Sequence, residues 1–204
     1  MKASTLTWPL LTLAVLLLLW QGVVVGFGVP DYLLPSPVQI AALIPARAGD
    51  LGPAALLTGG EALGGLMLSA VAGIAAGLFF SISAAIRRCF YPYVVLLQTI
   101  PIIAVSPLIL LWLGNGSLSV LFIAFLISFP AVAVNTTQGL ISVDPRLLDL
   151  FRMGNATLPE VLFKLRLPHA LPQIFAGLKI AAGASVVGAL AGLRGFGRSA
   201  TVTY

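Results

Sequence analysis

Few residues of this chain could do chemistry, and they do not converge on a reaction. The sequence holds one histidine, His169, and one cysteine, Cys89, so we expect neither a multi-ligand metal site nor a disulfide within the chain. No nucleophile, base and orienting acid lie together along the sequence. No Gly-x-x-x-x-Gly-Lys-Ser/Thr segment is present to cradle a nucleotide phosphate. The sequence therefore predicts no catalytic residue, no metal, no cofactor and no enzyme activity of the chain itself.

The composition predicts an integral membrane protein. Hydrophobic residues make up 59% of the chain and charged residues 8%, and the mean hydropathy is +1.08. Soluble domains carry about 25% charged residues, so this chain cannot cover its own surface with polar groups. The net charge of +5 is interpreted as an excess of Lys and Arg on cytoplasmic loops rather than as a nucleic-acid-binding surface.

Apolar runs predict an all-α, polytopic fold with about five transmembrane helices in a domain covering residues 1–192. The expected spans are residues 8–27, 60–86, 91–113, 118–137 and 171–193. A cleaved signal peptide is the alternative for the first span, but its apolar run is longer than the typical 7–15 residues or so and no A-x-A-like site follows.

Residues 29–58 are expected to form an external loop with at most a short helix at Val38–Leu43, because five prolines interrupt any sustained period. Two stripes of small residues, spaced every four positions, predict close helix packing in the second and fifth spans. These stripes are Gly65, Ser69, Gly73, Gly77, Ser81 and Ala85, and Gly177, Ala181, Ser185 and Ala189. Arg87-Arg88 is expected to end the second span on the cytoplasmic side.

The third span contains Pro101 and Pro107, so we expect it to be bent or broken. Gln98, Thr99 and Ser106 lie beside the break, where they could satisfy freed carbonyl groups or line a water-filled path. Polar side chains within spans usually face protein or water. The residues predicted to lie nearest a translocation pathway are Gln98, Thr99, Ser128 and Asn135.

Basic residues predict a cytoplasmic N-terminus. With Lys2 inside, eight of the eleven basic residues fall on the cytoplasmic side. These eight are Lys2, Arg87, Arg88, Arg146, Arg152, Lys164, Arg166 and Lys179.

A proline-marked block, Ile141–Pro172, interrupts the apolar spans. Asp144-Pro145 places a side-chain acceptor at a helix N-cap and a proline at the first helical position. Apolar and charged residues then follow at helical spacing up to Gly154, where we expect a left-handed C-cap.

A second short helix is predicted to begin at Thr157, because Glu160 three positions later completes a capping box. Pro168 and Pro172 are expected to stop this helix near Leu167 and turn the chain back into the membrane. Both helices are too polar to lie within lipid, so they could bind a soluble partner at the membrane surface. An ordinary interfacial loop among anionic headgroups is the alternative.

The block resembles the cytoplasmic coupling loop of binding-protein-dependent ABC transporter permeases, and residues 144–167 are called the coupling loop below. Gly154 matches the family's motif glycine, and Leu167-Pro168 with Leu171-Pro172 matches its closing Leu-Pro pairs. Ile100–Leu108 and Leu111–Gly116 resemble the family's proline-rich span and the following turn. The motif's opening glutamate falls on Leu148, so that acidic anchor is displaced to Asp149 or lost.

The resemblance implies a permease subunit driven by cytoplasmic ABC ATPase subunits and supplied by an extracytoplasmic solute-binding protein, in the bacterial plasma (inner) membrane. It implies that two permease chains pair, either as a homodimer or as a heterodimer. It also implies that membrane lipid surrounds the pair. The branch that it most resembles serves nitrate, sulfonates, taurine and pyrimidine precursors of thiamine. The residues implied to couple to the ATPase are Asp149, Phe151, Gly154, Leu158 and Pro159.

Residues 193–204 differ from the acidic, glycine-rich continuation that is usual in the family. This atypical polar tail suggests a truncated or frame-shifted chain, and a non-functional permease is therefore one alternative. A self-sufficient channel or secondary transporter is another, although the spans hold few ionisable groups for coupling. An intramembrane enzyme would need a catalytic constellation that the sequence lacks.

Overall fold

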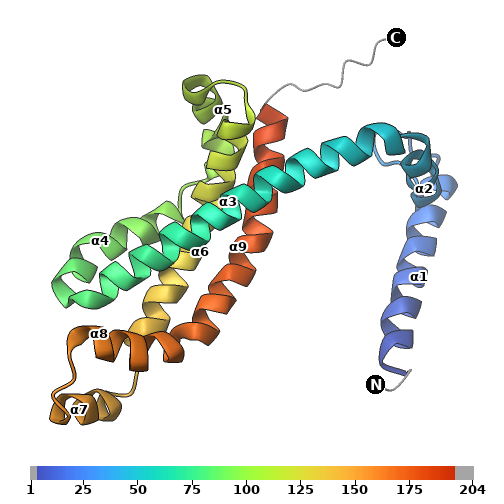
Figure 1. Ribbon diagram of the computed structural model, residues 1–204. Helices are drawn as coiled ribbons and strands as arrows, with labels where there is room; N and C mark the ends of the chain where they lie inside the picture. The colour runs from blue at the N-terminus through green and yellow to red at the C-terminus, as the bar shows by residue number, and fades with distance from the viewer. Residues whose placement is uncertain (1–3, 196–204) are drawn as a thin grey trace. The chain divides into compact units, whose positions relative to one another are not determined.

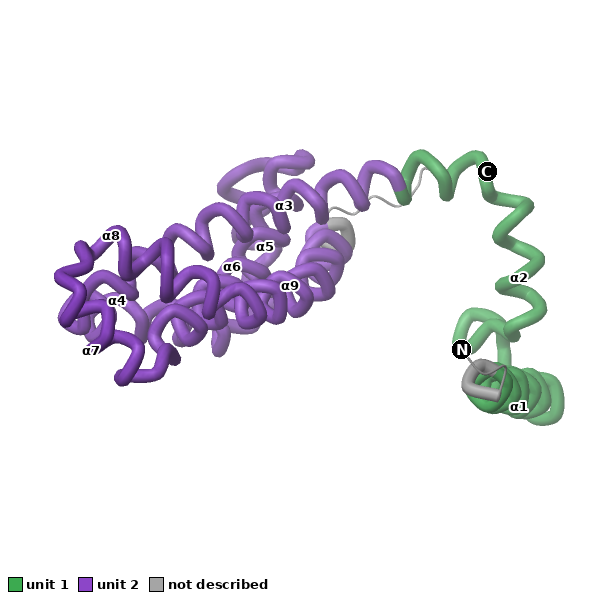
Figure 2. Tube along the Cα trace, turned by 60° about the horizontal axis from the view of Figure 1, so that its bottom comes forward, with its two compact units in different colours: residues 1–55 green, residues 56–204 purple. Residues whose placement is uncertain are grey.

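The computed structural model describes residues 4–195, with side chains for residues 7–192, and within that range every regular element is a helix. The chain divides into two units, residues 1–55 and 56–204, coloured separately in Figure 2. The predicted all-α fold is confirmed. The atypical tail lies almost wholly outside the described residues.

The first unit contains α1 (Ser4–Gly26), α2 (Pro37–Ala46) and the start of α3 (Ala48–Ile82). A capping box starts α2: Ser36 donates its N–H to Gln39 Oε1 at 2.8 Å, and Gln39 donates its own N–H to Ser36 Oγ at 3.3 Å. The short helix expected at Val38–Leu43 is therefore present within the longer α2, whereas the loop expected after it is wrong, because α3 begins at Ala48. Pro37 lies in the first turn of α2, where a helix tolerates proline, whereas Pro45 and Pro53 lie inside α2 and α3.

The second unit is built around α6 (Ser117–Ile141), which packs between α3 and α9 (Leu167–Gly195) (Figure 1). The small-residue stripe of α3 lies directly against α6. A Cβ added at Gly65 would lie 2.6 Å from Ala124 Cβ, and one at Gly77 would lie 2.5 Å from Thr136 Cγ2. The predicted role of the stripe is confirmed, because any larger residue would force the two backbones apart.

The second stripe also packs closely against α6. A Cβ at Gly177 of this stripe would lie 2.8 Å from Asn135 Cβ, and one at Gly188, beside the stripe residue Ala189, would lie 2.7 Å from Ala124 Cα. Ser128 Oγ donates to the carbonyl oxygen of Ala181 at 3.1 Å, joining α6 to α9. The centre of the unit is therefore closely packed, with Ile123, Val132 and Leu140 fully buried.

The third predicted span is α4 (Ala84–Leu97) followed by α5 (Ile102–Leu113), two helices that meet at 94°. Pro101 stands at the N-cap of α5, and Pro107 lies within it. The predicted break is confirmed. The second span was expected to continue to Ile86 and end at Arg87-Arg88. It ends instead at Ile82, because Ser83 adopts an extended conformation and caps α4 by accepting the Ala85 N–H at 3.2 Å.

The described residues contain four helices that are long and apolar enough to cross a membrane, or five if α4 and α5 form one bent span. The bounds are wider than predicted: α6 extends to Ile141, and α9 begins at Leu167. About five spans were expected, and this architecture agrees.

Candidate coupling site and translocation path

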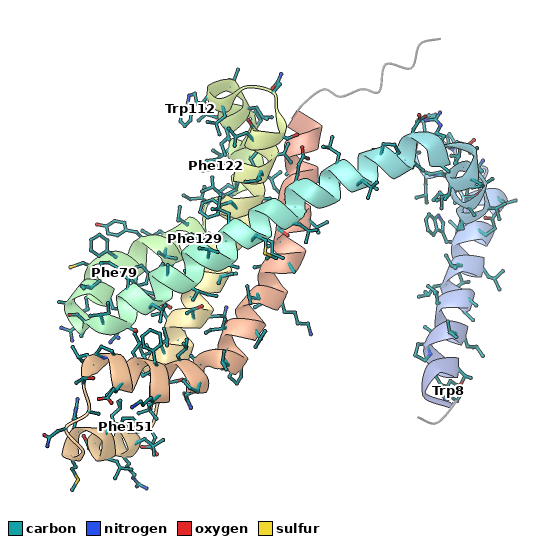
Figure 3. All side chains as sticks on the ribbon, in the orientation of Figure 1. Trp8, Phe79, Trp112, Phe122, Phe129 and Phe151 are labelled. Carbon is teal, nitrogen blue, oxygen red and sulfur yellow. The ribbon has the colours of Figure 1, made fainter. Side chains whose placement is uncertain are left out.

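The first helix of the coupling loop, α7 (Pro145–Met153), is capped as predicted: Asp144 Oδ1 accepts the N–H of Arg146 at 2.9 Å. No residue of α7 is buried, and Met153 is 84% exposed. The Arg152–Asp149 ion pair, 3.0 Å long, stays on the surface. Figure 3 shows Phe151 on the side of α7 that faces α8. An amphipathic helix that leaves its apolar residues uncovered has a surface to offer to a partner.

The turn after α7 differs from the prediction. Gly154 has φ −77°, and the left-handed residue is Asn155 with φ 52°. Asn tolerates this conformation better than most residues, since its short side chain can bond locally. A Cβ added at Gly154 would meet no atom closer than Phe151 O at 3.5 Å, an ordinary contact. Nothing within the described chain therefore requires glycine at position 154.

The second helix begins as predicted, with the short α8 (Leu158–Glu160) leading into a π-helical segment, η1 (Val161–Arg166). Glu160 Oε2 accepts the N–H of Thr157 at 3.0 Å, and Glu160 Oε1 accepts a bond from Lys164 Nζ at 2.8 Å. The Lys164 ammonium and the Thr157 donors lower the pKa of Glu160 to about 2. Glu160 therefore stays ionised at physiological pH and holds the start of α8 in place.

The expectation that Pro168 and Pro172 stop the second helix is wrong. The chain runs from Leu158 to Gly192 as one 35-residue helix that qualifies as a membrane span. The π-helical register explains why the helix continues. Leu167 donates its N–H to Leu162 O, five residues back, so the hydrogen-bonding register has shifted by one residue just before Pro168. A helix of this length exceeds the roughly 20 residues that a membrane requires, which leaves its first turns for the coupling loop.

The π-helical segment is fixed to the membrane core. Leu162 and Leu167 pack against a buried cluster of Leu140, Ala170 and Ile174. Arg166 Nη1 donates to the carbonyl oxygen of Ser81, at the end of α3, at 2.8 Å. Sequence reasoning missed this bond, since nothing in the local pattern links positions 85 residues apart. The coupling loop therefore has an exposed half, α7 and its turn, and an anchored half, η1.

All five residues implied to couple to an ATPase lie on or near the surface of this loop. Asp149, Gly154 and Pro159 are exposed, Leu158 is 79% exposed, and Phe151 is half-buried. They flank one turn, between the end of α7 and the start of α8 (Figure 1).

The structure separates the four residues predicted for the pathway. Gln98 lies at the α4–α5 break and lines a cavity of about 210 Å³ with Pro101, Leu126 and Val187 among its walls. Thr99 Oγ1 donates to Leu96 O at 2.8 Å, and Ser106 Oγ donates to Ile103 O at 2.8 Å. Both hydroxyls therefore satisfy local carbonyl groups, which was the alternative reading for the polar residues at this break.

The other two predicted pathway residues are engaged in helix bonds. Ser128 is fully buried in its bond to Ala181 O, and Asn135 Nδ2 donates to Ala131 O at 2.8 Å, one turn earlier. Of the four, only Gln98 lines a described cavity.

Long apolar helices packed through small residues, with a polar two-helix loop at one end, define a polytopic membrane protein. The chain belongs to the family described as "Binding-protein-dependent transport system inner membrane component", which matches residues 69–199. It is thus a multi-pass inner-membrane permease of the ABC type. The matched range ends inside the tail 193–204, so the point at which the chain departs from the family stays a prediction.

Similar proteins match most of this chain in sequence. A formylaminopyrimidine transport permease protein of Halalkalibacterium halodurans is 35% identical over 90% of this chain and 74% of its own. A probable ABC transporter permease protein of Haemophilus influenzae is 34% identical over 90% of this chain and 75% of its own. The taurine transport system permease protein of Escherichia coli is 30% identical over 84% of this chain and 65% of its own.

Proposed function

We propose that this chain is the permease subunit of an importer in which separate cytoplasmic ATPase subunits act on the exposed half of the coupling loop. The observation that carries the proposal is the division of that loop. Its outer helix α7 and the turn at Gly154 are uncovered, whereas η1 is fixed to α3 and continues directly into α9. A displacement that reaches α8 and η1 would pass into α9 without a break in the helix.

The open space around Gly154 supports this turn as the place where the ATPase contacts the coupling loop. The chain itself has room for a side chain there, since a Cβ would meet only carbonyl oxygens at 3.5 and 3.7 Å. A partner surface that approaches the backbone closely would explain why this position is glycine. Asp149, Phe151, Leu158 and Pro159 would surround that contact.

The transported solute is proposed to be a small organic or inorganic molecule of the nitrate, sulfonate, taurine or pyrimidine-precursor type, delivered by an extracytoplasmic binding protein. The names of similar proteins support this range, and they include formylaminopyrimidine and taurine. Two permease chains would enclose the path, with the N-terminus in the cytoplasm. Gln98 is the residue best placed to contact the solute, because it borders a cavity at a break in the helices.

A self-sufficient secondary transporter is the competing class. Such a transporter needs ionisable groups within its spans that load and release a coupling ion. Glu61 is buried in α3, whereas Lys179 is exposed on α9 and its long side chain can reach towards the membrane surface. No pair formed by these two is present among the described ion pairs.

The test is co-purification of the ATPase subunit with a Gly154→Leu variant. We expect the variant to fold, because the chain leaves space for the side chain, but to lose the ATPase and ATP-driven uptake. Gly116→Leu is the matched control: it makes the same change in open space at the start of α6, and it should keep both activities. Solute uptake by the purified chain without ATPase would contradict the proposal and favour the secondary transporter.

A further inference from the structure

A cavity of about 260 Å³ lies between the end of α3 and the anchored half of the coupling loop. Its walls are mainly apolar, from Ile82 on one side and Val161, Leu162 and Phe163 on the other. Leu158 and Phe163 also line it and are 79% and 61% exposed, so the cavity opens to the outside of the chain. The cavity at Gln98 shares no lining residue with it.

One side chain brings positive charge into this apolar space. Arg166 lines the cavity, and its Nη1 is engaged with Ser81 O. Its Nε is buried and has no hydrogen-bond partner. A buried donor left unpaired costs free energy, and more when the group is charged. The guanidinium therefore has a free donor for an acceptor that the chain does not supply.

The surroundings of Arg166 are short of negative charge. Burial lowers the pKa of Arg166, and the nearby charges of Arg87 and Arg152 lower it further. Asp149 compensates Arg152, but no described carboxylate lies within ion-pair distance of Arg87 or Arg166. An anion at this point would relieve like-charge repulsion and fill the free donor position at once.

We propose that this cavity binds an anionic phospholipid, with the phosphate at Arg166 and the beginning of an acyl chain along Ile82, Leu162 and Phe163. The combination of a guanidinium with mostly apolar walls suits an amphiphile rather than a free inorganic anion. The cavity also adjoins the ends of membrane helices, where basic pockets bind lipid headgroups. An acidic segment of a partner protein fits less well, because it would leave the apolar walls without a partner.

A lipid in this position would brace the junction through which the coupling loop meets α3. Its phosphate would complete the hydrogen bonding of the arginine that already joins η1 to Ser81 O. The inference is independent of the ATPase, so it can be tested on the full-length permease chain alone.

The test counts lipids retained by the purified full-length chain in native mass spectrometry, comparing phosphatidylglycerol with phosphatidylcholine of the same acyl chains. We expect preferential retention of phosphatidylglycerol, and weaker binding by about fivefold in Arg166→Gln, in line with the loss of one basic residue at a lipid site. Arg146→Gln is the control, since Arg146 is an exposed basic residue of α7 that does not line the cavity. Equal losses in the two variants would overturn the proposal, because they would indicate unspecific attraction.

A second pair of variants leaves the Arg166–Ser81 bond in place. Phe163→Asp and Phe163→Asn both remove the exposed ring at the cavity, but only the aspartate repels an anion. We expect phosphatidylglycerol binding to fall several-fold further in Phe163→Asp than in Phe163→Asn. Identical binding by the two variants would contradict the proposal. Displacement of the lipid by millimolar inorganic phosphate would also contradict it and indicate a simple anion site.

Discussion

A hydrogen bond between Arg166 and Ser81 joins the coupling loop to α3. The bond from Arg166 Nη1 to Ser81 O, 2.8 Å long, connects the π-helical end of the coupling loop with the last turn of α3. Because η1 continues into α9, this one contact links α9, α3 and the coupling loop at the same end of the bundle.

Removal of this link should impair transport more than it impairs ATPase binding. Arg166→Leu is expected to lower the free energy of unfolding by about 1.5–3 kcal/mol, the usual contribution of a hydrogen bond to a charged group. The exposed half of the loop stays intact, so the ATPase should still co-purify while ATP-driven uptake falls. Arg152→Leu is the control for stability: its ion pair with Asp149 has side chains 76% and 65% exposed, and its loss should cost less than about 1 kcal/mol. Equal destabilisation by the two changes would contradict this account.

Close packing of α3 on α6 predicts that Gly77 cannot be enlarged. A Cβ there would lie 2.5 Å from Thr136 Cγ2 and 3.2 Å from the backbone nitrogen of Thr137, so Gly77→Leu must separate the helices. We expect a loss of about 1–3 kcal/mol or more, measured as a lower temperature of aggregation in detergent. Gly183→Leu places the same side chain in open space on α9 and should change that temperature little. A Gly77→Leu protein as stable as the control would show that the two helices do not pack this way.

The capping box at Thr157 should be insensitive to pH over the physiological range. The pKa of Glu160 is lowered to about 2 from an ordinary 4.5, so its stabilisation is complete above about pH 4.5 and is lost as the pH falls through 2. Hydrogen exchange of the Val161 amide, which donates to Thr157 O, should therefore reveal unchanged protection between pH 8 and pH 5, after correction for intrinsic rates. Glu160→Ala should lower this protection at every pH in that window. A marked loss of protection near pH 6 in the unaltered chain would contradict the assignment.

The translocation path can be separated from the helix packing by two substitutions. Ser128→Ala removes a buried bond between α6 and α9, so it should lower stability by about 1 kcal/mol and leave the KM for uptake unchanged. Gln98→Leu, in the lining of the cavity at the α4–α5 break, should raise the KM with little effect on stability. The test is to measure stability and the KM for uptake in both variants. The reversed pattern would place Ser128 rather than Gln98 on the translocation path.

Local signals in the sequence predicted the helix starts well. Asp144-Pro145 and Thr157-x-x-Glu160 formed the predicted caps, because a cap depends only on residues within one turn. The glycine stripe of α3 likewise predicted close packing, since the spacing of small residues fixes one face of a helix. Pro101 correctly indicated the break between α4 and α5.

The errors arose where a shift in backbone register or a distant contact decides the outcome. Pro168 and Pro172 did not stop the helix. The π-helical turn before them had already shifted the pairing of N–H donors with carbonyl acceptors. The left-handed residue fell on Asn155 rather than Gly154, one position later. The Arg166–Ser81 bond joins segments far apart in sequence, so no local pattern could predict it.

The most direct test of the central claim is the labelling of a single cysteine in α7, measured in membrane vesicles of known orientation. Met153→Cys in a Cys89→Ser background places a thiol at a residue that is 84% exposed, while the one natural cysteine is removed. We predict that a membrane-impermeant maleimide labels this thiol only from the cytoplasmic side, and that bound ATPase subunits protect it. Labelling from the extracytoplasmic side, or labelling that the ATPase leaves unchanged, would contradict the claim that force enters through the coupling loop.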